Sequence, residues 1–506
     1  MEGNQIGIII TILLYLCGMI FIGYRTLEKN KTVGDFYLGG RQLGPLVTAM
    51  SAEASDMSSW LLMGLPGVAY ISGISDAGWT AIGLAAGTYL NWLIVAKRLR
   101  RYTEKIDAIT LPEFFSKRYH DTTKLLMLIS ALWIIVFFVP YTASGFVACG
   151  KLFNSLFGVN YHVAMIVSAI IIILYTTLGG FLAASTTDFV QSIVMSIALI
   201  VILLFGVNVA GGLDAVIKNA AELPGYLSMT HMYDATAQTS TPYSLLTIVS
   251  TCAWGLGYFG MPHILLRFMA IEDENKVALS RRVASVWVVI SMAASVLIGV
   301  VGYTMSKVGA LEVLTGTNSE TIIVRVADLM SRNGIVFAFI AGVVLSGILA
   351  STMSTSDSQL LAASSSMSND IINGYFNKNY DQKTLLKISR ICLLAIALIG
   401  MVLAWDPNGS VFQIVSFAWA GFGASFGPVV LLALFWKNSN KWGALSGMIT
   451  GGAMIFIWKF LIKPIGGIFG IYELLPAFIL ALVVNVVVSL VSGGAQESVQ
   501  REFEEV

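Results

Sequence analysis

Three stretches of this chain place groups that could bind an ion or a polar solute inside otherwise apolar sequence. In the first, Glu53, Asp56 and four serines fall between Ser51 and Ser59. An acidic side chain at the centre of a membrane helix costs on the order of 3 kcal/mol, so it survives where it faces protein or a water-filled cavity. Serine and aspartate also compete for the backbone hydrogen bonds of a helix. We expect the helix to unwind near Ala54 to Ser59; a polar patch packed against other helices is the alternative.

The second stretch, WGLGYFGMPHILLRFMA at 254–270, concentrates helix-weakening residues. Three glycines and Pro262 occur within eight residues. Glycine costs about 1 kcal/mol and proline about 3 kcal/mol inside a helix. A second break is therefore expected near Gly255 to Gly260, with a proline-kinked structural helix as the alternative.

The third stretch, ILASTMSTSDSQLL at 348–361, places hydroxyls at Ser351, Thr352, Ser354 and Thr355 on about one helical turn. Sodium is a hard cation and prefers oxygen ligands. These hydroxyls and the bare carbonyls of an unwound segment 54–59 would supply about five oxygens. Alternatively, the hydroxyls bond to the preceding turn or bridge helices.

The elements that position these stretches are membrane helices. The 506 residues are 56% hydrophobic and 12% charged, whereas soluble domains are about 25% charged. A membrane helix needs roughly 20 apolar residues. Hydropathy predicts an all-α integral membrane protein with about thirteen spans, near 5–25, 46–73, 78–97, 125–153, 160–179, 185–211, 243–270, 280–306, 325–356, 385–405, 409–436, 441–462 and 469–492.

Charge predicts the orientation of these helices. With the N-terminus outside and the C-terminus in the cytoplasm, about 23 of the 30 Lys and Arg residues fall in cytoplasmic loops and the tail, as the positive-inside rule requires. Arg267 is expected to snorkel to the headgroups, and Asp357 to meet water. The net charge of +1 gives no reason to propose nucleic acid as a partner.

The two predicted breaks occupy corresponding places, because five spans begin near residue 46 and five more near residue 243. Paired broken helices are typical of inverted-repeat transporters with a mid-membrane site. We expect a first extra helix and loop at 1–45, one repeat at 46–211, an extracellular loop at 212–242, a second repeat at 243–436, and two further helices and a tail at 437–506.

At these residues the chain resembles the sodium/solute symporter family, particularly its proline-transporting branch. The similar motifs run in the family's order along nearly the whole chain: LGGRQLGP (38–45), ASDMSSWLLMGLPG (54–67), LYTTLGGFLAASTTDFVQ (174–191), GLGYFGMPHILLRFM (255–269), ILASTMST (348–355) and FAWAGFGASFGPVVL (417–431). The resemblance implies a LeuT-type 5+5 inverted-repeat core, with one extra helix before it and two after it.

The resemblance also implies roles for matching positions. Backbone carbonyls of Ala54, Met57 and Ser351 and hydroxyls of Ser354 and Thr355 would bind sodium. Arg41, Asp56 and Asp188 would serve coupling. The implied substrate pocket consists of Ser58, Trp60, Tyr141, Trp254, Tyr258 and Pro262.

The chain departs from the family pattern at a few positions. Glu53 stands where a neutral residue is usual, and Ser59 where a glycine is usual. Ser351 replaces a small alanine, and Met261 sits where a glutamine is common. Glu53 is expected either to be a protonated structural acid or to alter the cation preference, and the loss of glycine at Ser59 to change the shape of the pocket.

Residues and resemblance together predict sodium-coupled symport of L-proline by alternating access across the bacterial plasma membrane, by a protein expected to be a monomer. Sodium is the co-transported ion. The alternative is a sodium symporter for another small solute: a different amino acid, pantothenate, a sugar or sialic acid. Walker A and HExxH patterns are absent and the four histidines do not cluster in sequence, so an enzyme is not expected.

Overall fold

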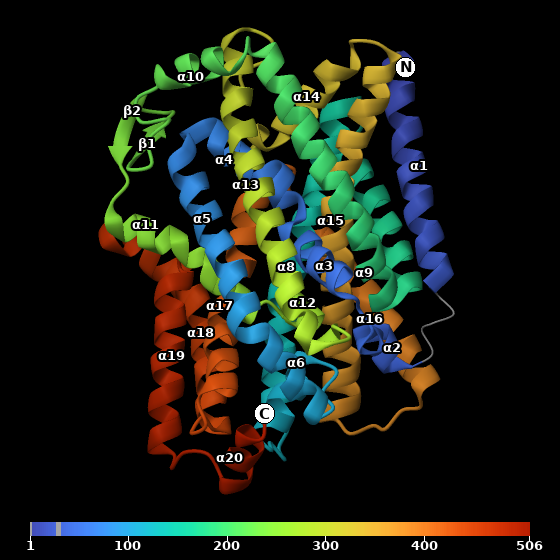
Figure 1. The fold of residues 1–506 in the computed structure, drawn as a ribbon, viewed down its shortest axis with the longest axis vertical. Helices are drawn as coiled ribbons and strands as arrows, with labels where there is room; N and C mark the ends of the chain where they lie inside the picture. The colour runs from blue at the N-terminus through green and yellow to red at the C-terminus, as the bar shows by residue number, and fades with distance from the viewer. Residues whose placement is uncertain (1–2, 27–31) are drawn as a thin grey trace.

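The computed structural model describes residues 3–26 and 32–506, and helices dominate it (Figure 1). Within these residues, ten helices are long and apolar enough to cross a membrane, and a bent helix pair makes an eleventh candidate. The apolar helix Tyr161–Leu174 is shorter. The predicted all-α membrane architecture is thus confirmed, while the count of thirteen spans and the inverted repeat stay predictions.

The helices follow one another along the chain with few strands between them. Their bounds are α1 Gly3–Thr26, α2 Val33–Leu38, α3 Pro45–Ser59, α4 Leu65–Ser72, α5 Ile74–Leu90, α6 Ala96–Lys105, α7 Leu111–Arg118, α8 Leu125–Phe157, α9 Tyr161–Val209, α10 Leu213–Ala221, α11 Leu245–Cys252, α12 Pro262–Ala270, α13 Val277–Lys307, α14 Ile322–Ser331, α15 Ile335–Ser365, α16 Gln382–Leu403, α17 Val411–Phe435, α18 Lys441–Ile457, α19 Leu474–Val491 and α20 Glu497–Glu504. The strands are β1 His231–Asp234 and β2 Thr239–Pro242.

The first predicted break is confirmed at the end of α3. Ser58 leaves the helix with φ 48° and ψ −173°, a backbone conformation that is rare outside glycine. Its hydroxyl accepts a hydrogen bond from the Trp60 backbone N–H at 3.1 Å. The serine side chain therefore replaces a ladder bond that the break removes, and α4 continues the span after the π-helical turn Trp60–Gly64.

The second predicted break is also confirmed. Between α11 and α12, residues Ala253–Gly260 form a 3₁₀ segment, Met261 is extended, and the two halves meet at 47°. Close packing explains the glycines. A Cβ on Gly255 would lie 2.2 Å from the carbonyl oxygen of Gly83, and one on Gly257 would lie 2.0 Å from Trp419 Nε1. The segment thus gives up helix geometry and packs its backbone directly against α5 and α17.

The broken helices lie in the middle of the bundle. Helix α3 packs against α9, α13 and α15, and the 3₁₀ segment against α5 and α17. Figure 1 shows α3, α8, α9 and α15 close together at the centre, with α18 and α19 to one side. The polar stretches that prompted the prediction are therefore enclosed by protein.

The segment between α9 and α11 forms a cap at one end of the molecule, called the hairpin end below (Figure 1). It contains α10 and the antiparallel hairpin of β1 and β2, in which His231 pairs with Pro242 and Asp234 with Thr239. The Tyr226 hydroxyl donates to the carbonyl oxygen of Tyr70 at 2.8 Å. The cap therefore rests on the α4–α5 turn.

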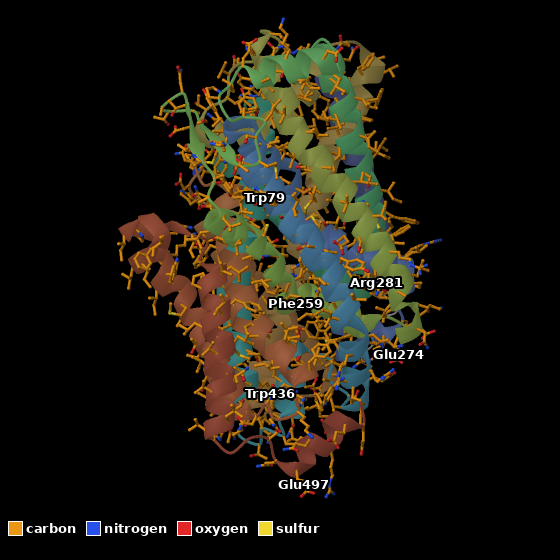
Figure 2. All side chains as sticks on the ribbon, turned by 60° about the vertical axis from the view of Figure 1, so that its left-hand side comes forward. Trp79, Phe259, Glu274, Arg281, Trp436 and Glu497 are labelled. Atoms are coloured by element: carbon orange, nitrogen blue, oxygen red, sulfur yellow. The ribbon has the colours of Figure 1, made fainter. Side chains whose placement is uncertain are left out.

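The opposite end, called the C-terminal end below, carries α20 (Figures 1 and 2). This short acidic helix docks on α6. Arg98 lies 4.6 Å from the centre of the Phe503 ring, and Lys105 Nζ lies 2.5 Å from Glu505 Oε2. Tyr102 donates a hydrogen bond of 3.0 Å to Glu502. The tail is thus folded back against a helix of the bundle.

Candidate functional site

A constricted cavity lies where the two broken helices meet. Its volume is about 10 Å³, roughly the space that one water molecule occupies. Eight side chains from several helices line it: Asp56, Met57, Trp60, Leu84, Tyr141, Trp254, Val415 and Trp419. Because a solute as large as an amino acid exceeds this volume, its binding requires the surrounding side chains to move apart.

Asp56 is the charged group of this cavity. The Tyr258 hydroxyl donates to Asp56 Oδ2 at 2.5 Å, and the Tyr141 hydroxyl donates to the Asp56 carbonyl oxygen at 3.1 Å. Asn91 Nδ2 in turn donates to the carbonyl oxygen of Tyr258 at 3.0 Å. Three predicted residues from three helical segments are thereby brought together, next to the break at Ser58.

Aromatic rings close the cavity on one side. The Trp254 ring lies 5.5 Å from Trp60, 5.6 Å from Phe412 and 5.1 Å from Tyr472 between ring centres. Trp419 Nε1 donates to the carbonyl oxygen of Trp254 at 2.7 Å. Such offset pairs stabilise one another beyond their buried area. We call the four rings Trp60, Trp254, Phe412 and Tyr472 the aromatic lid.

Sequence reasoning found only two members of the aromatic lid. Phe412 and Tyr472 are not predicted as site residues, because an aromatic residue in a membrane span is more often an interfacial anchor. Tyr472 comes from the segment just before α19. Its backbone N–H donates to Ser250 Oγ at 2.7 Å and its hydroxyl to the Ser416 carbonyl oxygen at 2.7 Å. No local sequence signal could have placed it over the cavity.

The hydroxyl turn of α15 meets α3 directly. Ser354 Oγ donates to the Ala54 carbonyl oxygen at 2.8 Å and lies 3.2 Å from the Ser351 carbonyl oxygen. Thr355 Oγ1 lies 3.1 Å from that same Ser351 carbonyl. All these residues are buried. Four of the five predicted sodium-binding residues therefore converge in one small region between the two helices.

The remaining hydroxyl and the remaining predicted ligand are placed differently. Thr352 Oγ1 bonds back to the carbonyl oxygen of Ile348 at 2.9 Å, and the hydroxyls of Ser351 and Thr355 also bond back to the preceding turn, as the structural alternative anticipates. Met57 lies one turn beyond Ala54, at the last residue before the break, and its side chain lines the cavity. Met57 therefore lies between the Ala54 carbonyl oxygen and the cavity, within a single turn of α3.

Asp188 belongs to a buried network with Arg267. Asp188 Oδ2 lies 3.1 Å from Arg267 Nη2 and accepts from Ser51 Oγ at 2.7 Å. Arg267 also donates to Ser51 Oγ at 3.0 Å and to Ser358 Oγ at 2.5 Å. The expectation that Arg267 snorkels to the headgroups is wrong, because its side chain is 1% exposed. Asp357, expected near water, is buried as well.

Glu53 and Ser59, the two notable departures, are both buried. Trp92 Nε1 donates to Glu53 Oε1 at 3.1 Å. Within residues 3–26 and 32–506, Glu53 Oε2 and Ser59 Oγ have no hydrogen-bond partner. A buried carboxyl group with one neutral donor is weakly compensated, and among the described residues Glu53 has only the Trp92 indole N–H as a donor.

Arg41 and Pro262 lie outside the aromatic cavity. Arg41 reaches the carbonyl oxygens of Met269 at 2.8 Å, Thr103 at 3.0 Å and Ala108 at 2.7 Å. It thereby ties the end of α12 to α6 and the following turn. Pro262 begins α12 and lines a second small cavity that Arg267 also borders. The structure thus separates Pro262 from the other predicted pocket residues.

Residues 423–427 read GASFG and match the G-x-S-x-G pattern of serine hydrolases. That pattern implies a nucleophile on a tight turn between a strand and a helix. Here the segment lies inside α17, and Ser425 is fully buried. The match therefore lacks the structural context of a nucleophile.

The chain matches a known protein family and characterised relatives. The model of the sodium:solute symporter family matches residues 36–451. The high-affinity proline transporter PutP of Bacillus subtilis is 42% identical over 96% of this chain and 98% of its own length. The sodium/proline symporter of Escherichia coli is 41% identical over 98% of this chain and 95% of its own.

The fold is shared with solved LeuT-fold transporters. A sodium-coupled sialic acid symporter in a substrate-bound outward-open state superposes with a TM-score of 0.79 at 16% identity, covering 97% of this chain and 99% of its own. The transporter Mhp1 in a closed conformation gives a TM-score of 0.55. Since the family model covers most of the chain and relatives near 40% identity span nearly all of it, the protein belongs to the sodium:solute symporter family.

Proposed function

We propose that this protein transports L-proline into the cell together with sodium. Curated relatives named as proline transporters and sodium/proline symporters, about 40% identical over nearly the full chain, support this activity. The observation that carries it in the structure is the contact of Ser354 with the Ala54 carbonyl oxygen, a single turn from Asp56. An ion site and a solute site then share one turn of α3.

Sodium binds, in this proposal, between α3 and α15. The carbonyl oxygens of Ala54, Met57 and Ser351 and the hydroxyl oxygens of Ser354 and Thr355 form the ligand set. In the structure, the Ser354 hydroxyl donates to Ala54. When the ion arrives, that hydroxyl rotates so that both oxygens face the cation. Hard oxygen ligands without a formal charge suit a monovalent ion that must also leave.

Proline binds beside the break in α3. The half-helix that follows Ser58 directs its positive dipole end toward the substrate carboxylate. The rings of Trp60, Tyr141, Trp254 and Tyr258 offer flat apolar faces to the pyrrolidine ring. Pro262 lines the second cavity. Its effect on proline binding is therefore indirect, through the position of the start of α12.

Coupling residues connect the two broken helices to the rest of the bundle. Asp188 links Ser51 of α3 to Arg267 of α12. Arg41 ties the end of α12 to α6. A ligand shifts a conformational equilibrium by its differential affinity for the two states. Sodium bound to α3 therefore shifts the conformational equilibrium of α6, α9 and α12, which these contacts connect.

The sodium gradient supplies enough energy for accumulation. A tenfold gradient contributes about 1.4 kcal/mol, and a potential of 100 mV adds about 2.3 kcal/mol per charge. The total of about 3.7 kcal/mol supports roughly 500-fold accumulation with one sodium per proline.

The proposed topology has thirteen spans with an inverted-repeat core, the N-terminus outside and the C-terminus in the cytoplasm. The hairpin end then faces outward, and the C-terminal end, where basic α6 and α7 lie, faces the cytoplasm. We propose that the protein acts as a monomer.

Purified protein in proteoliposomes tests the function. Labelled proline uptake is measured with an inward sodium gradient and with choline in place of sodium. We expect strong dependence on sodium, and competition by unlabelled proline over other amino acids, pantothenate, sugars and sialic acid. Full uptake in choline contradicts the coupling, and stronger competition by another solute contradicts the substrate.

A further inference from the structure

A large apolar groove lies on the outer surface of the bundle, between α5 and α13. Its volume is about 520 Å³, far larger than the cavity at the broken helices. Side chains along its edges are substantially exposed, including Ile82 at 48%, Val289 at 56% and Leu297 at 48%. Because both helices belong to candidate membrane spans, this surface faces the hydrocarbon of the bilayer.

Several of the residues that line the groove are small. Gly78, Ala81 and Ala85 follow one another along α5, and Ala293 lies on α13. Met229, from the cap, closes the groove at the hairpin end, where its carbonyl accepts a hydrogen bond from Trp79 Nε1 at 2.7 Å. The groove is therefore bounded by protein at that end and continues toward the C-terminal end.

Toward the C-terminal end, the same stripe of α13 carries polar groups. With 100° per residue, Ser285 and Met292 lie within about 40° of Arg281 around the helix. Met292 lines the groove, so Arg281 and Ser285 continue it. On α5, Tyr89 lies one turn beyond the groove residue Ala85, and the Arg281 guanidinium lies 5.4 Å from the centre of the Tyr89 ring.

Two polar atoms at this position are buried and unsatisfied. Within the described residues 3–26 and 32–506, Arg281 Nε and Ser285 Oγ have no hydrogen-bond partner. Buried donors of this kind are normally paired, and leaving one unpaired is costly. A ligand with a strong acceptor next to the groove would satisfy both.

The charges around Arg281 leave its own charge unbalanced. The acids that precede α13 in the sequence pair with other residues, Glu274 with Arg101 and Glu272 with Lys276. The adjacent Arg282 adds a further positive charge. Among the ion pairs of the described residues, none involves Arg281. The site therefore favours an anion.

The dimensions fit a lipid. At 1.5 Å per residue, Arg281 lies about 16 Å along α13 from Met292 and about 24 Å from Leu297. One leaflet of the hydrocarbon core is about 15 Å deep. A headgroup held at Arg281, near the membrane surface, thus places an acyl chain along the groove. Figure 2 labels Arg281 near one end of α13 and Trp79 near the opposite end of α5.

We propose that the groove and the Arg281–Ser285 pair form a binding site for an anionic phospholipid. The phosphodiester accepts hydrogen bonds from Arg281 Nε and Ser285 Oγ, and one acyl chain fills the space between α5 and α13. Helix α13 also contacts the first broken span, because Ser295 Oγ donates at 2.6 Å to the Leu61 carbonyl oxygen in the π-helical turn that follows α3. The lipid therefore stabilises a helix pair adjacent to the broken span.

Lipid binding to the purified full-length protein tests the proposal. Phosphatidylglycerol and phosphatidylcholine with identical chains are added at equal molar ratios, and retained lipid is counted by native mass spectrometry beside the thermal unfolding midpoint. Both lipids carry the phosphodiester, but the choline of phosphatidylcholine adds a positive charge that Arg281 and Arg282 repel. We therefore expect about tenfold tighter retention of phosphatidylglycerol. Inorganic phosphate alone is expected to give no midpoint shift. Equal retention of both lipids, or a shift with phosphate alone, overturns the proposal.

Matched variants locate the site. Arg281→Ala should abolish the preference for phosphatidylglycerol, whereas Arg282→Ala, an equal charge change on the next residue, should keep it. Ala293→Phe, which fills the groove without altering charge, should weaken retention of both lipids. If Arg282→Ala acts as strongly as Arg281→Ala, general surface charge explains the binding. If Ala293→Phe leaves retention unchanged, the groove is not occupied by a chain.

Discussion

The Tyr258 hydroxyl donates a 2.5 Å hydrogen bond to Asp56 Oδ2, and this bond joins the two broken helices of the protein. Asp56 precedes the break at Ser58 by two residues, and Tyr258 precedes extended Met261 by three. Any opening of the cavity that separates the two helices must break or reorient this contact. It therefore couples the backbone geometry of both breaks to the solute site.

Tyr258→Phe tests that coupling. The substitution keeps the ring and removes the hydroxyl, so Asp56 loses its side-chain donor. A hydrogen bond to a charged group contributes about 1.5–3 kcal/mol, which corresponds to a loss of about 10- to 100-fold in kcat/KM for proline. Uptake kinetics in proteoliposomes at saturating sodium measure it.

Tyr119→Phe is the matched control for that experiment. Tyr119 is also buried and also bonded through its hydroxyl, to Ser439 at 2.8 Å, but it lies outside the residues that line the cavity. We expect uptake close to that of the unmodified protein. Similar losses in both variants would show that the effect of Tyr258 is general destabilisation.

Thr355→Ala should weaken sodium binding. Loss of one oxygen from a set of about five should raise the half-saturating sodium concentration at least about tenfold, by analogy with a charge-assisted contact. Thr355→Ser retains the hydroxyl and should stay near the original value. Thr352→Ala provides the control on the same turn, because Thr352 is outside the proposed ligand set, although both threonines bond back to the carbonyl oxygen four residues earlier. An equal effect of Thr352→Ala would refute the assigned ligand set.

Glu53→Gln should preserve transport. Glutamine can still accept the hydrogen bond from Trp92 Nε1 and removes a carboxyl group that is costly to bury. Because one neutral hydrogen bond contributes about 1 kcal/mol, we expect proline uptake within about fivefold of the original. Asp56→Asn, in contrast, should lose sodium-dependent uptake. A collapse of uptake in Glu53→Gln would assign this acid a direct role in cation binding.

Tyr472→Ala should open the aromatic lid. The Trp254–Tyr472 stack contributes about 0.5–1.5 kcal/mol beyond buried area, so KM for proline should rise about two- to tenfold. Tyr472→Phe keeps the ring and removes only the bond to Ser416, and should change KM less. Equal KM values for Tyr472→Ala and the unmodified protein would exclude Tyr472 from the substrate site.

The contact between the C-terminal helix and α6 should weaken in acid. The hydrogen bond from Lys105 holds the pKa of the Glu505 carboxyl below its ordinary value of 4.5. With a lowered pKa, the contact contributes fully above pH 4.5 and is lost as pH falls through the lowered value. A spin label at Ser498→Cys, in a background lacking the native cysteines, should become mobile in that range. Lys105→Gln should already increase its mobility at neutral pH.

The membrane class and the positions of the helix breaks could be predicted from the amino-acid sequence alone. Ser, Gly and Pro act on the backbone within a few residues of their own position, so the breaks at Ser58 and Ala253–Gly260 could be predicted from local composition. The same holds for the hydroxyl turn at 351–355. Family motifs then pointed to Trp60, Tyr141, Trp254 and Tyr258, which the structure gathers around Asp56, and to Pro262 and Arg41, which lie outside that cavity.

Tertiary structure decided which distant groups meet. Arg267 was expected at the headgroups, yet it pairs with Asp188, because a buried charge is stable where several acceptors converge on it. Tyr472 and Phe412 complete the aromatic lid from segments that carry no local signal. Such contacts depend on the packing of whole helices against one another, and the spacing of residues along one helix does not contain that information.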